Sequence, residues 1–194
     1  LKDSMEVAII AAGCFWCTEA IFKRLIGVEQ VEVGFAGGHQ PNPSYREVCK
    51  GTTGHAEAIR ITYDPKQLSY MDILEVFWLA HDPTSLNKQG DDEGEQYRSA
   101  IFYLNESQHQ AALLSRELIA QAFDTPIVTE IVPAGTFYPA QEEYLMNYYE
   151  NNTDRGYCIF TIAPKINKIH DLFQKRIKPT YQALEHENRT QKTL

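Results

Sequence analysis

Apolar and polar residues alternate along three stretches of the chain, and this pattern predicts strands. The first stretch has the sequence EVAIIAA, the second VEQVEVGFA and the third HAEAIRITY. Alternation with a period of two is typical of strands that are buried on one face. Two shorter apolar stretches with neighbouring turn residues predict two more strands. The five predicted strands are residues 6–12, 28–36, 55–63, 97–104 and 126–132.

Helical patterns separate these strands. Ser69 is followed three residues later by Asp72, the spacing of a reciprocal cap at a helix start. Pro83 disfavours helix in the residue before it, so this helix ends near His81. Asn105 is placed to cap a third helix, with Gln108 as its reciprocal partner. The predicted helices cover residues 20–25, 69–81, 105–123 and 139–149.

The predicted order β-α-β-β-α-β-α-β-α indicates an α+β fold. We expect a two-layer sandwich with a mixed β-sheet packed by helices, a ferredoxin-like core and a long irregular C-terminal segment. The length of 194 residues suits one domain, residues 1–194, with its core at about 6–168. Residues 180–194 are polar and are expected to form a flexible tail.

Composition excludes several classes of protein. The net charge is −8 and no arginine-rich run occurs, so a nucleic-acid partner is not expected. No apolar stretch approaches the roughly 18 to 20 residues of a membrane span, and the first residues lack a signal-peptide pattern. Four cysteines are too few for a secreted disulfide scaffold of this length. A reducing, cytoplasmic setting with a transient catalytic disulfide is the more natural interpretation.

The run Gly13-Cys14-Phe15-Trp16-Cys17-Thr18-Glu19 is the most informative motif. It places Cys14 at a turn from a strand into a helix. The partial positive charge of a helix N-terminus stabilises a thiolate and lowers the pKa of the thiol. Cys14 is therefore a candidate nucleophile or redox centre. The alternatives are a small core residue or a metal ligand, because free cysteines are often simply buried.

A nucleophilic cysteine needs groups that handle protons. Glu57 lies among Ala56, Ala58 and Ile59, and an apolar pocket would raise the pKa of its carboxyl and keep it protonated. The alternation of this strand equally allows Glu57 to face solvent. Tyr45 and Tyr97 each lie beside a polar loop. A phenol donates hydrogen bonds and stays neutral at pH 7, although either tyrosine could be a packing residue.

A metal site is less well supported. The acidic loop at 91–95 does not have the spacing of an EF-hand. Cys14, Cys17, Cys49 and His55 could supply four zinc ligands, but a cysteine and a histidine separated by five residues are not a common pair. We therefore expect no metal and no cofactor.

Several motifs together resemble one known family. They occur in the family's order between about Glu6 and Lys168, and the set is far more specific than a single C-x-x-C pair. Besides the run around Cys14, they are Asn42–Cys49, Thr53–Ala58, His81–Pro83, Gln89–Asp92 and Gln96–Ser99. This set is similar to peptide methionine sulfoxide reductase of the A type.

The resemblance implies an enzyme that reduces the S epimer of methionine sulfoxide, free or in oxidised proteins. Cys14 takes the place of the family's nucleophile, and Glu57 that of the proton donor to the sulfoxide oxygen. Tyr45 and Tyr97 match the phenols that hydrogen-bond near this oxygen. Asp92 matches the carboxylate beside them that holds an ordered water.

The resemblance also implies the substrate pocket and the recycling step. Phe15 and Trp16 match the aromatic pocket for the S-methyl group. Cys158 matches a C-terminal recycling cysteine, and Cys17, one helical turn from Cys14, is the second choice for the resolving thiol. Cys49 is interpreted as a packing residue. A thioredoxin-like reductant would then clear the disulfide.

Two other functions remain open at this stage. The C-x-x-C pair at a helix start also suits a general thiol-disulfide oxidoreductase, although a bulky Phe-Trp stands where such motifs commonly have Gly-Pro. The third possibility is a non-enzymatic zinc or scaffold protein.

Overall fold

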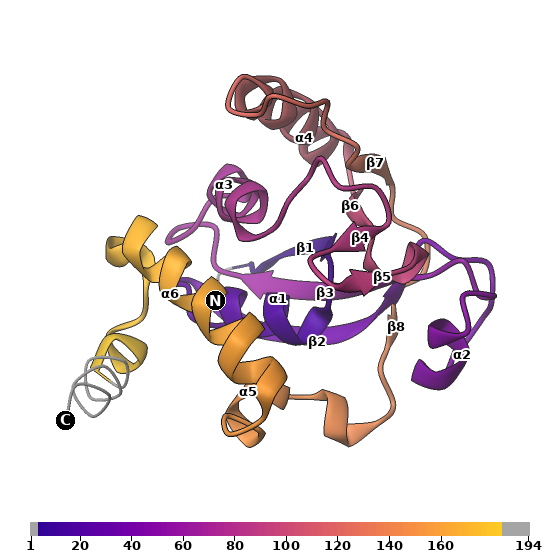
Figure 1. The fold of residues 1–194 in the computed structure, drawn as a ribbon. Coiled ribbons are helices and arrows are strands. Elements are labelled where there is room, and N and C mark those ends of the chain that lie inside the picture. The colour runs from indigo at the N-terminus through magenta and orange to yellow at the C-terminus, as the bar shows by residue number, and fades with distance from the viewer. Residues whose placement is uncertain (1–3, 184–194) are drawn as a thin grey trace.

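A six-stranded mixed sheet is the centre of the molecule (Figure 1). The computed structural model describes residues 4–183. The chain first forms a β-α-β-β-α-β unit: β1 (Glu6–Ala12), α1 (Phe15–Phe22), β2 (Val28–Ala36), β3 (Ala56–Tyr63), α3 (Tyr70–Ala80) and β6 (Ser99–Tyr103). Its strands lie in the order β6-β1-β3-β2 and are antiparallel, which is the predicted ferredoxin-like arrangement.

Two short strands extend this sheet. β7 (Glu130–Pro133) runs parallel to β6, and β8 (Tyr138–Pro139) pairs antiparallel with β2. The sheet is therefore mixed, as predicted. The other elements are α2 (Tyr45–Cys49), β4 (Lys88–Gln89), β5 (Asp92–Glu93), η1 (Glu95–Tyr97), α4 (Glu106–Ala120), η2 (Glu143–Leu145), α5 (Tyr148–Asn151), η3 (Cys158–Ile162), α6 (Ala163–Leu172) and η4 (Gln174–Arg176).

The two faces of the sheet are covered differently. Along β1, Ala8, Ile10 and Ala12 enter the large core that lies under the helices, while Ile9 and Ala11 enter a smaller cluster on the opposite face. Successive side chains of a strand point to opposite faces of the sheet. Because both faces are buried at β1, this strand is almost continuously apolar. The large core includes the cysteines of the N-terminal motif, so the candidate chemistry lies on the helix side.

The helix caps follow the sequence closely. Ser69 Oγ accepts the Asp72 N–H at 3.0 Å, and Asp72 Oδ2 accepts the Ser69 N–H at 2.9 Å, so the predicted capping box is present. Asn105 caps α4 by accepting the Gln108 N–H at 2.9 Å. The side-chain oxygen of Gln108, however, accepts the N–H of Leu104 and not that of Asn105, so the predicted reciprocal bond is displaced by one residue.

The structure corrects two helix predictions. α1 begins at Phe15, so the N-terminal motif is itself part of the helix. The helix predicted at 139–149 is wrong: this segment starts in β8 and continues as the short turns η2 and α5. Pro139 pairs with Gly34 of β2, and Asn147 has a φ of 52°, which interrupts a right-handed helix.

The C-terminal segment is more regular than predicted. The π-helical turn η3 leads directly into α6, which packs on α1 (Figure 1). Residues 179–183 are helical, and the rest of the predicted tail, 184–194, lies outside the described residues.

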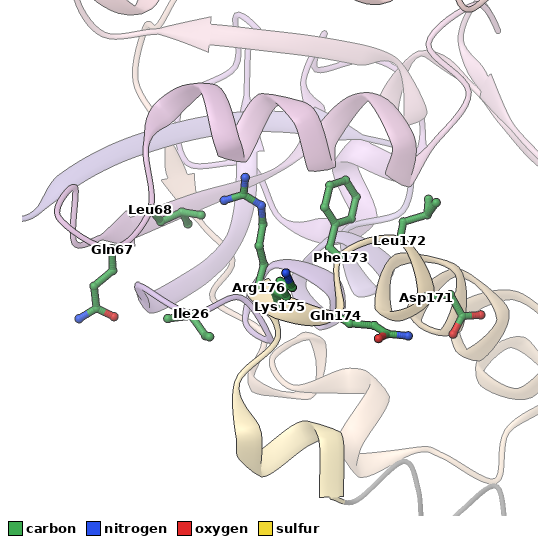
Figure 2. A pocket seen from close by; sticks show the side chains of 9 residues that line it. All are labelled: Ile26, Gln67, Leu68, Asp171, Leu172, Phe173, Gln174, Lys175 and Arg176. Carbon is green, nitrogen blue, oxygen red and sulfur yellow. The ribbon is translucent and has the colours of Figure 1, made fainter.

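The η4 turn after α6 contacts the first half of the chain. Arg176 accepts the Ile26 N–H through its carbonyl oxygen at 2.7 Å and pairs with Asp72 through its guanidinium at 2.9 Å. A hollow of about 620 Å³ lies here, lined by Ile26, Gln67, Leu68 and residues 171–176 (Figure 2). It contains no thiol and none of the predicted site residues. None of the helices within residues 4–183 combines the length and apolar character needed to cross a bilayer.

Candidate active site

Cys14 lies at the sharp turn that joins β1 to α1. Gly13 has a φ of 87°, and a Cβ there would lie 2.9 Å from Gln89 Cγ, so the turn requires glycine on both counts. The Cys14 carbonyl accepts the Cys17 N–H at 3.1 Å and thereby begins the helix. The sequence thus places Cys14 at the helix N-cap, as predicted.

The predicted direction of the Cys14 pKa is wrong for this structure. Cys14 is only 7% exposed, and this burial, followed by a hydrogen bond with Cys17 and the nearby Glu57, raises the pKa of its thiol well above the ordinary value. The Cys14 side chain makes no capping hydrogen bond to the helix. Desolvation therefore outweighs the helix dipole. The same hydrogen bond with Cys14 lowers the pKa of Cys17.

Glu57 lies directly below this turn. It shares a face of β3 with Ile59 and Ile61 and is 1% exposed, so the solvent-facing alternative is wrong. One carboxyl oxygen, Oε1, accepts the Phe15 N–H at 3.2 Å. The other, Oε2, accepts from the Gln96 side-chain amide at 2.8 Å. The acid thus touches the residue that follows Cys14.

The environment of Glu57 raises its pKa to about 7. Burial is the largest cause, and the negative charge of Asp92 adds to it. The hydrogen bonds from Gln96 and Phe15 oppose the shift because they favour the carboxylate. A carboxyl group with this pKa can both hold and release a proton near neutral pH.

The two predicted phenols lie in the same neighbourhood. Tyr45 starts α2, and its ring centre lies 6.0 Å from that of Phe15 with a 25° angle between the planes. Burial and then the charge of Glu57 raise the pKa of both Tyr45 and Tyr97, so both stay protonated donors at neutral pH. Asp92 also raises the pKa of Tyr97, which places these groups within electrostatic reach of one another.

A third phenol, Tyr157, was missed by the sequence analysis. Its hydroxyl donates to Asp92 Oδ2 at 2.7 Å and lies 3.8 Å from Cys17 Sγ. It also forms a hydrogen bond with Cys14. Its position directly before Cys158, the predicted recycling cysteine, was the available signal, since a residue in this position is expected near Cys14.

Aromatic side chains form one wall of the site. Trp16 stacks on Tyr148 with ring centres 3.6 Å apart, and Tyr157 meets Trp16 edge-on at 5.7 Å. Phe15 is fully buried and packs between the sheet and Tyr45. Phe15 therefore forms the base of the site, and the half-buried Trp16 forms its side.

Glu19 of the N-terminal motif supports this wall. It is 3% exposed and accepts the Asn147 N–H through Oε2 at 3.1 Å. Asn147 immediately precedes Tyr148, so this bond fixes the backbone that presents the stacked ring. Lys23 reinforces the contact by donating to Asn147 Oδ1 at 2.6 Å.

The other cysteines differ in exposure. Cys158 is fully buried, and burial together with nearby Cys17 raises the pKa of its thiol. Cys49 is exposed, so its interpretation as a packing residue is wrong. It lies 3.6 Å from the side-chain nitrogen of Gln96. All four cysteines are reduced.

The described residues offer no arrangement of three or more His, Cys, Asp or Glu suited to a metal ion. Both ring nitrogens of His55, a member of the alternative zinc set, are engaged by the backbone: Nδ1 accepts from Gly38 at 3.0 Å, and Nε2 lies 2.7 Å from the Gln40 carbonyl. The donors near Cys14 are thiols and phenols that hydrogen-bond to one another.

An open hollow of about 910 Å³ adjoins the cluster. Asp92 and Tyr157 belong to both, and Phe160, Lys165 and Lys168 line the outer part. Phe160 is 80% exposed. The hollow therefore leads from solvent to the Tyr157 hydroxyl that contacts the thiols.

A cysteine at a helix start, above a buried carboxyl and surrounded by phenols, defines a thiol-dependent enzyme on a ferredoxin-like α+β core. The family model described as peptide methionine sulfoxide reductase matches residues 6–177. The chain belongs to this family.

Individual relatives agree with the family assignment. The Deinococcus radiodurans protein named peptide methionine sulfoxide reductase MsrA is 53% identical over 180 residues, covering 90% of this chain and 85% of that protein. A protein of the same name from Acinetobacter baumannii is 51% identical over 174 residues, covering 90% and 99%.

Solved structures share the fold. The reduced form of Mxr1 from Saccharomyces cerevisiae matches with a TM-score of 0.76 and 31% identity, over 81% of this chain and 91% of that chain. Methionine sulfoxide reductase A of Corynebacterium diphtheriae matches with a TM-score of 0.73 and 38% identity, over 77% and 76%.

Proposed function

We propose that this protein reduces methionine sulfoxide of the S configuration at sulfur, free or in oxidised proteins, to methionine. The observation that carries this proposal is the hydrogen bond from the N–H of Phe15 to Glu57 Oε1 at 3.2 Å, which puts a buried acid against the residue that follows Cys14. A sulfoxide oxygen leaves readily only after protonation, so nucleophile and acid have to meet at one sulfur atom.

In the first step, the Cys14 sulfur attacks the substrate sulfur while Glu57 gives its proton to the oxygen. Tyr45 and Tyr97 hydrogen-bond this oxygen, and Asp92 holds a water molecule beside them. The attack forms a bond between the two sulfurs, and the protonated oxygen then passes to the Cys14 sulfur as this bond and the S–O bond of the substrate break. The products are methionine, a sulfenic acid on Cys14 and the Glu57 carboxylate; the substrate sulfur gains two electrons and the cysteine sulfur loses two.

The electrostatic interaction between Glu57 and Cys14 favours the combination that this step needs, a protonated Glu57 and a Cys14 thiolate. The negative charge of an ionised Glu57 is one cause of the raised pKa of Cys14. When Glu57 is protonated, this repulsion disappears and the thiolate forms more easily. The protonated acid and the anionic nucleophile therefore stabilise each other.

The aromatic wall selects a small thioether. Trp16, with Phe15 beneath it, would bury the methyl group of the substrate and exclude water. The substrate would enter through the adjoining hollow, and the Tyr157 hydroxyl would move off Cys14 as it does so.

In the second step, a thiol condenses with the sulfenic acid to form a disulfide and water. We assign this role to Cys158, with Cys17 as the second choice. The electrostatic influence of Cys17 on Cys158 supports a short path between the C-terminal thiol and the nucleophile. A thioredoxin-like dithiol would then reduce the disulfide, which suits a reducing, cytoplasmic setting. One catalytic domain would perform the whole cycle.

A chiral assay tests the proposal. The purified protein is supplied with separated S and R sulfoxides of an acetylated methionine and a dithiol reductant. We expect turnover of the S epimer and none of the R epimer. Turnover of R alone, or of neither, would reject the proposal.

One observation favours a second candidate, a thiol-disulfide oxidoreductase that uses Cys14 and Cys17. A hydrogen bond between the two thiols raises the pKa of Cys14 and lowers that of Cys17. Insulin reduction measures this activity directly. Strong insulin reduction without sulfoxide turnover would favour the second candidate.

A further inference from the structure

The proposed catalytic role of Glu57 requires a buried carboxyl to be stable in two protonation states. If it donates a proton in each turnover, it alternates between a neutral and a charged form while 1% exposed. A buried polar group that loses its hydrogen-bond partner costs about 1 to 3 kcal/mol. Its neighbours must therefore accommodate both forms.

Only one neighbour of the carboxyl can reverse its role. Oε1 accepts from the backbone N–H of Phe15, which can only donate. Oε2 accepts from the Gln96 side chain at 2.8 Å. A glutamine amide carries both a donor and an acceptor, and the two exchange places when the amide turns by half a revolution.

We propose that Gln96 is a positioning residue that pairs with both protonation states of Glu57: its NH₂ group donates to the carboxylate, and its carbonyl accepts the O–H of the protonated acid. This inference rests on the proposed function for its catalytic meaning. Its effect on Glu57 can be measured separately.

The position of Gln96 supports this role. It is 7% exposed and lies in η1, directly before Tyr97. The η1 turn is anchored by the Tyr97 N–H to the Gly94 carbonyl at 3.0 Å, and by the Gly94 N–H to the Asn87 carbonyl at 2.9 Å. The amide therefore projects toward Glu57 from a fixed backbone, while its nitrogen also lies 3.6 Å from Cys49 Sγ.

Other groups around Glu57 affect its charge, but among residues 4–183 only Phe15 and Gln96 hydrogen-bond to its carboxyl. The titratable neighbours that interact with it electrostatically are Asp92, Cys17, Cys14, Tyr45 and Tyr97. Cys49 Sγ lies 3.6 Å from the Gln96 side-chain nitrogen. Gln96 is thus the side chain whose removal changes the hydrogen bonding of Glu57 and leaves these charges in place.

The test compares two buried glutamines. Gln96→Met keeps the length of the side chain and removes both donor and acceptor. Gln89→Met is the matched control, because Gln89 is 5% exposed and its amide pairs with the Asp82 backbone. A third variant, Gln96→Glu, keeps the shape and replaces the donor by a second acid, so it serves if the methionine variant folds poorly.

The primary readout is infrared spectroscopy of the protonated Glu57 carboxyl as a function of pH, assigned by subtracting the Glu57→Gln spectrum. Gln96→Met removes a hydrogen bond from the carboxylate and a weaker one from the protonated acid, because bonds to charged groups are the stronger ones. The carboxylate therefore loses more, and we expect the acid dissociation constant of Glu57 to fall by about tenfold, the difference between the two bonds. Gln89→Met should leave it unchanged.

The pH dependence of turnover should shift in the same direction as the pKa of Glu57. Sulfoxide turnover should decline at a higher pH in Gln96→Met than in the wild type, and kcat should fall more than KM rises. Equal titrations of Glu57 in the wild type, Gln96→Met and Gln96→Glu would overturn the inference. If the wild type does not reduce sulfoxide, the proposed function fails, but the infrared titration still decides the role of Gln96.

Discussion

The two halves of the active site are built in different ways. The proposed nucleophile, Cys14, and the proposed acid, Glu57, come from β1, α1 and β3, whose backbones are joined in one antiparallel sheet and its first helix. The Tyr148 and Tyr157 side of the site comes from the segment after β8, which has no strand in the sheet. Around the site, contacts that involve side chains hold this segment in place, such as Glu19 with the Asn147 N–H and Tyr157 with Asp92, whereas backbone bonds to the first half of the chain lie further on, at Arg176 and Lys178.

This difference separates chemistry from access and recycling. Groups that must stay within hydrogen-bond distance of each other are carried on the hydrogen-bonded sheet, where the backbone cannot shift independently. In the proposed mechanism, the segment that opens for substrate and brings Cys158 toward Cys14 is held near the site by bonds that can break one at a time. Substitutions in the two regions should therefore differ in kind.

The largest effect is expected at the nucleophile. Cys14→Ser should lower sulfoxide reduction by at least about 10³-fold, because an alcohol cannot accept the oxygen by this route. Cys49→Ser is the matched control, since Cys49 is an exposed thiol that lies 3.6 Å from Gln96, the side chain that hydrogen-bonds to Glu57. Single-turnover formation of methionine measures the step, and full activity of Cys14→Ser would remove Cys14 from the mechanism.

The next effect should appear only after the first turnover. Cys158→Ser should still release one equivalent of methionine per protein, but steady-state turnover with a thioredoxin-like reductant should be lost. Cys17→Ser should retain steady-state turnover. Mapping the disulfide formed after one equivalent of sulfoxide provides the check. A link between Cys14 and Cys17 would reverse the assignment.

Substitution of Glu57 should lower the rate of sulfoxide reduction by an intermediate factor. Glu57→Gln keeps a weak donor and should slow reduction by about 10²-fold, and Glu57→Ala should slow it further. Because the acid is active when protonated and the pKa of Glu57 is raised to about 7, wild-type turnover by this route should decline as pH rises through that value. The rate of each variant across pH measures this, and equal rates in all three proteins would exclude Glu57.

The same carboxyl affects stability in a predictable direction. Its pKa in the folded protein is about 7, against an ordinary value of 4.5, so between these values the folded state retains a proton that the unfolded chain has lost. The free energy of unfolding should thus fall by about 3 kcal/mol across this window and stay level above it. Denaturant titrations of wild type and Glu57→Gln should show this slope only in the wild type.

The smallest effect is expected in the C-terminal half. Tyr157→Phe removes the 2.7 Å hydrogen bond to Asp92 and leaves the ring against Trp16. Loss of about 1 kcal/mol should loosen the segment and change KM by several-fold, with little change in the single-turnover rate. A large loss of single-turnover rate would instead place Tyr157 among the groups that assist the chemistry.

The sequence predicted the sheet better than the segment that follows it. β1 and β2 have the predicted bounds, and the capping box at Ser69 formed as expected, because period-two alternation and caps are local properties. The segment 139–149 failed because Pro139 pairs with a strand distant in sequence. No local pattern contains that information.

For the site, the residue types were predictable and their environments were not. Cys14 was placed correctly at the helix start, but its burial, which raises the pKa of the thiol, depends on residues from the other end of the chain. Gln96 and Tyr157 were missed because a glutamine or a tyrosine has no distinctive spacing of its own. Their importance arises only from contact with Glu57 and Asp92.

By itself, the sequence determined the strand pattern, the helix start at Cys14 and the set of motifs that defines the family, since each depends on neighbours along the chain. Only the tertiary structure decided which face of β3 carries Glu57, how far water is excluded from Cys14, and which side chains hold the C-terminal segment. These properties depend on desolvation and hydrogen bonding between segments far apart in the chain, as between Cys17 and Tyr157, which are 140 residues apart.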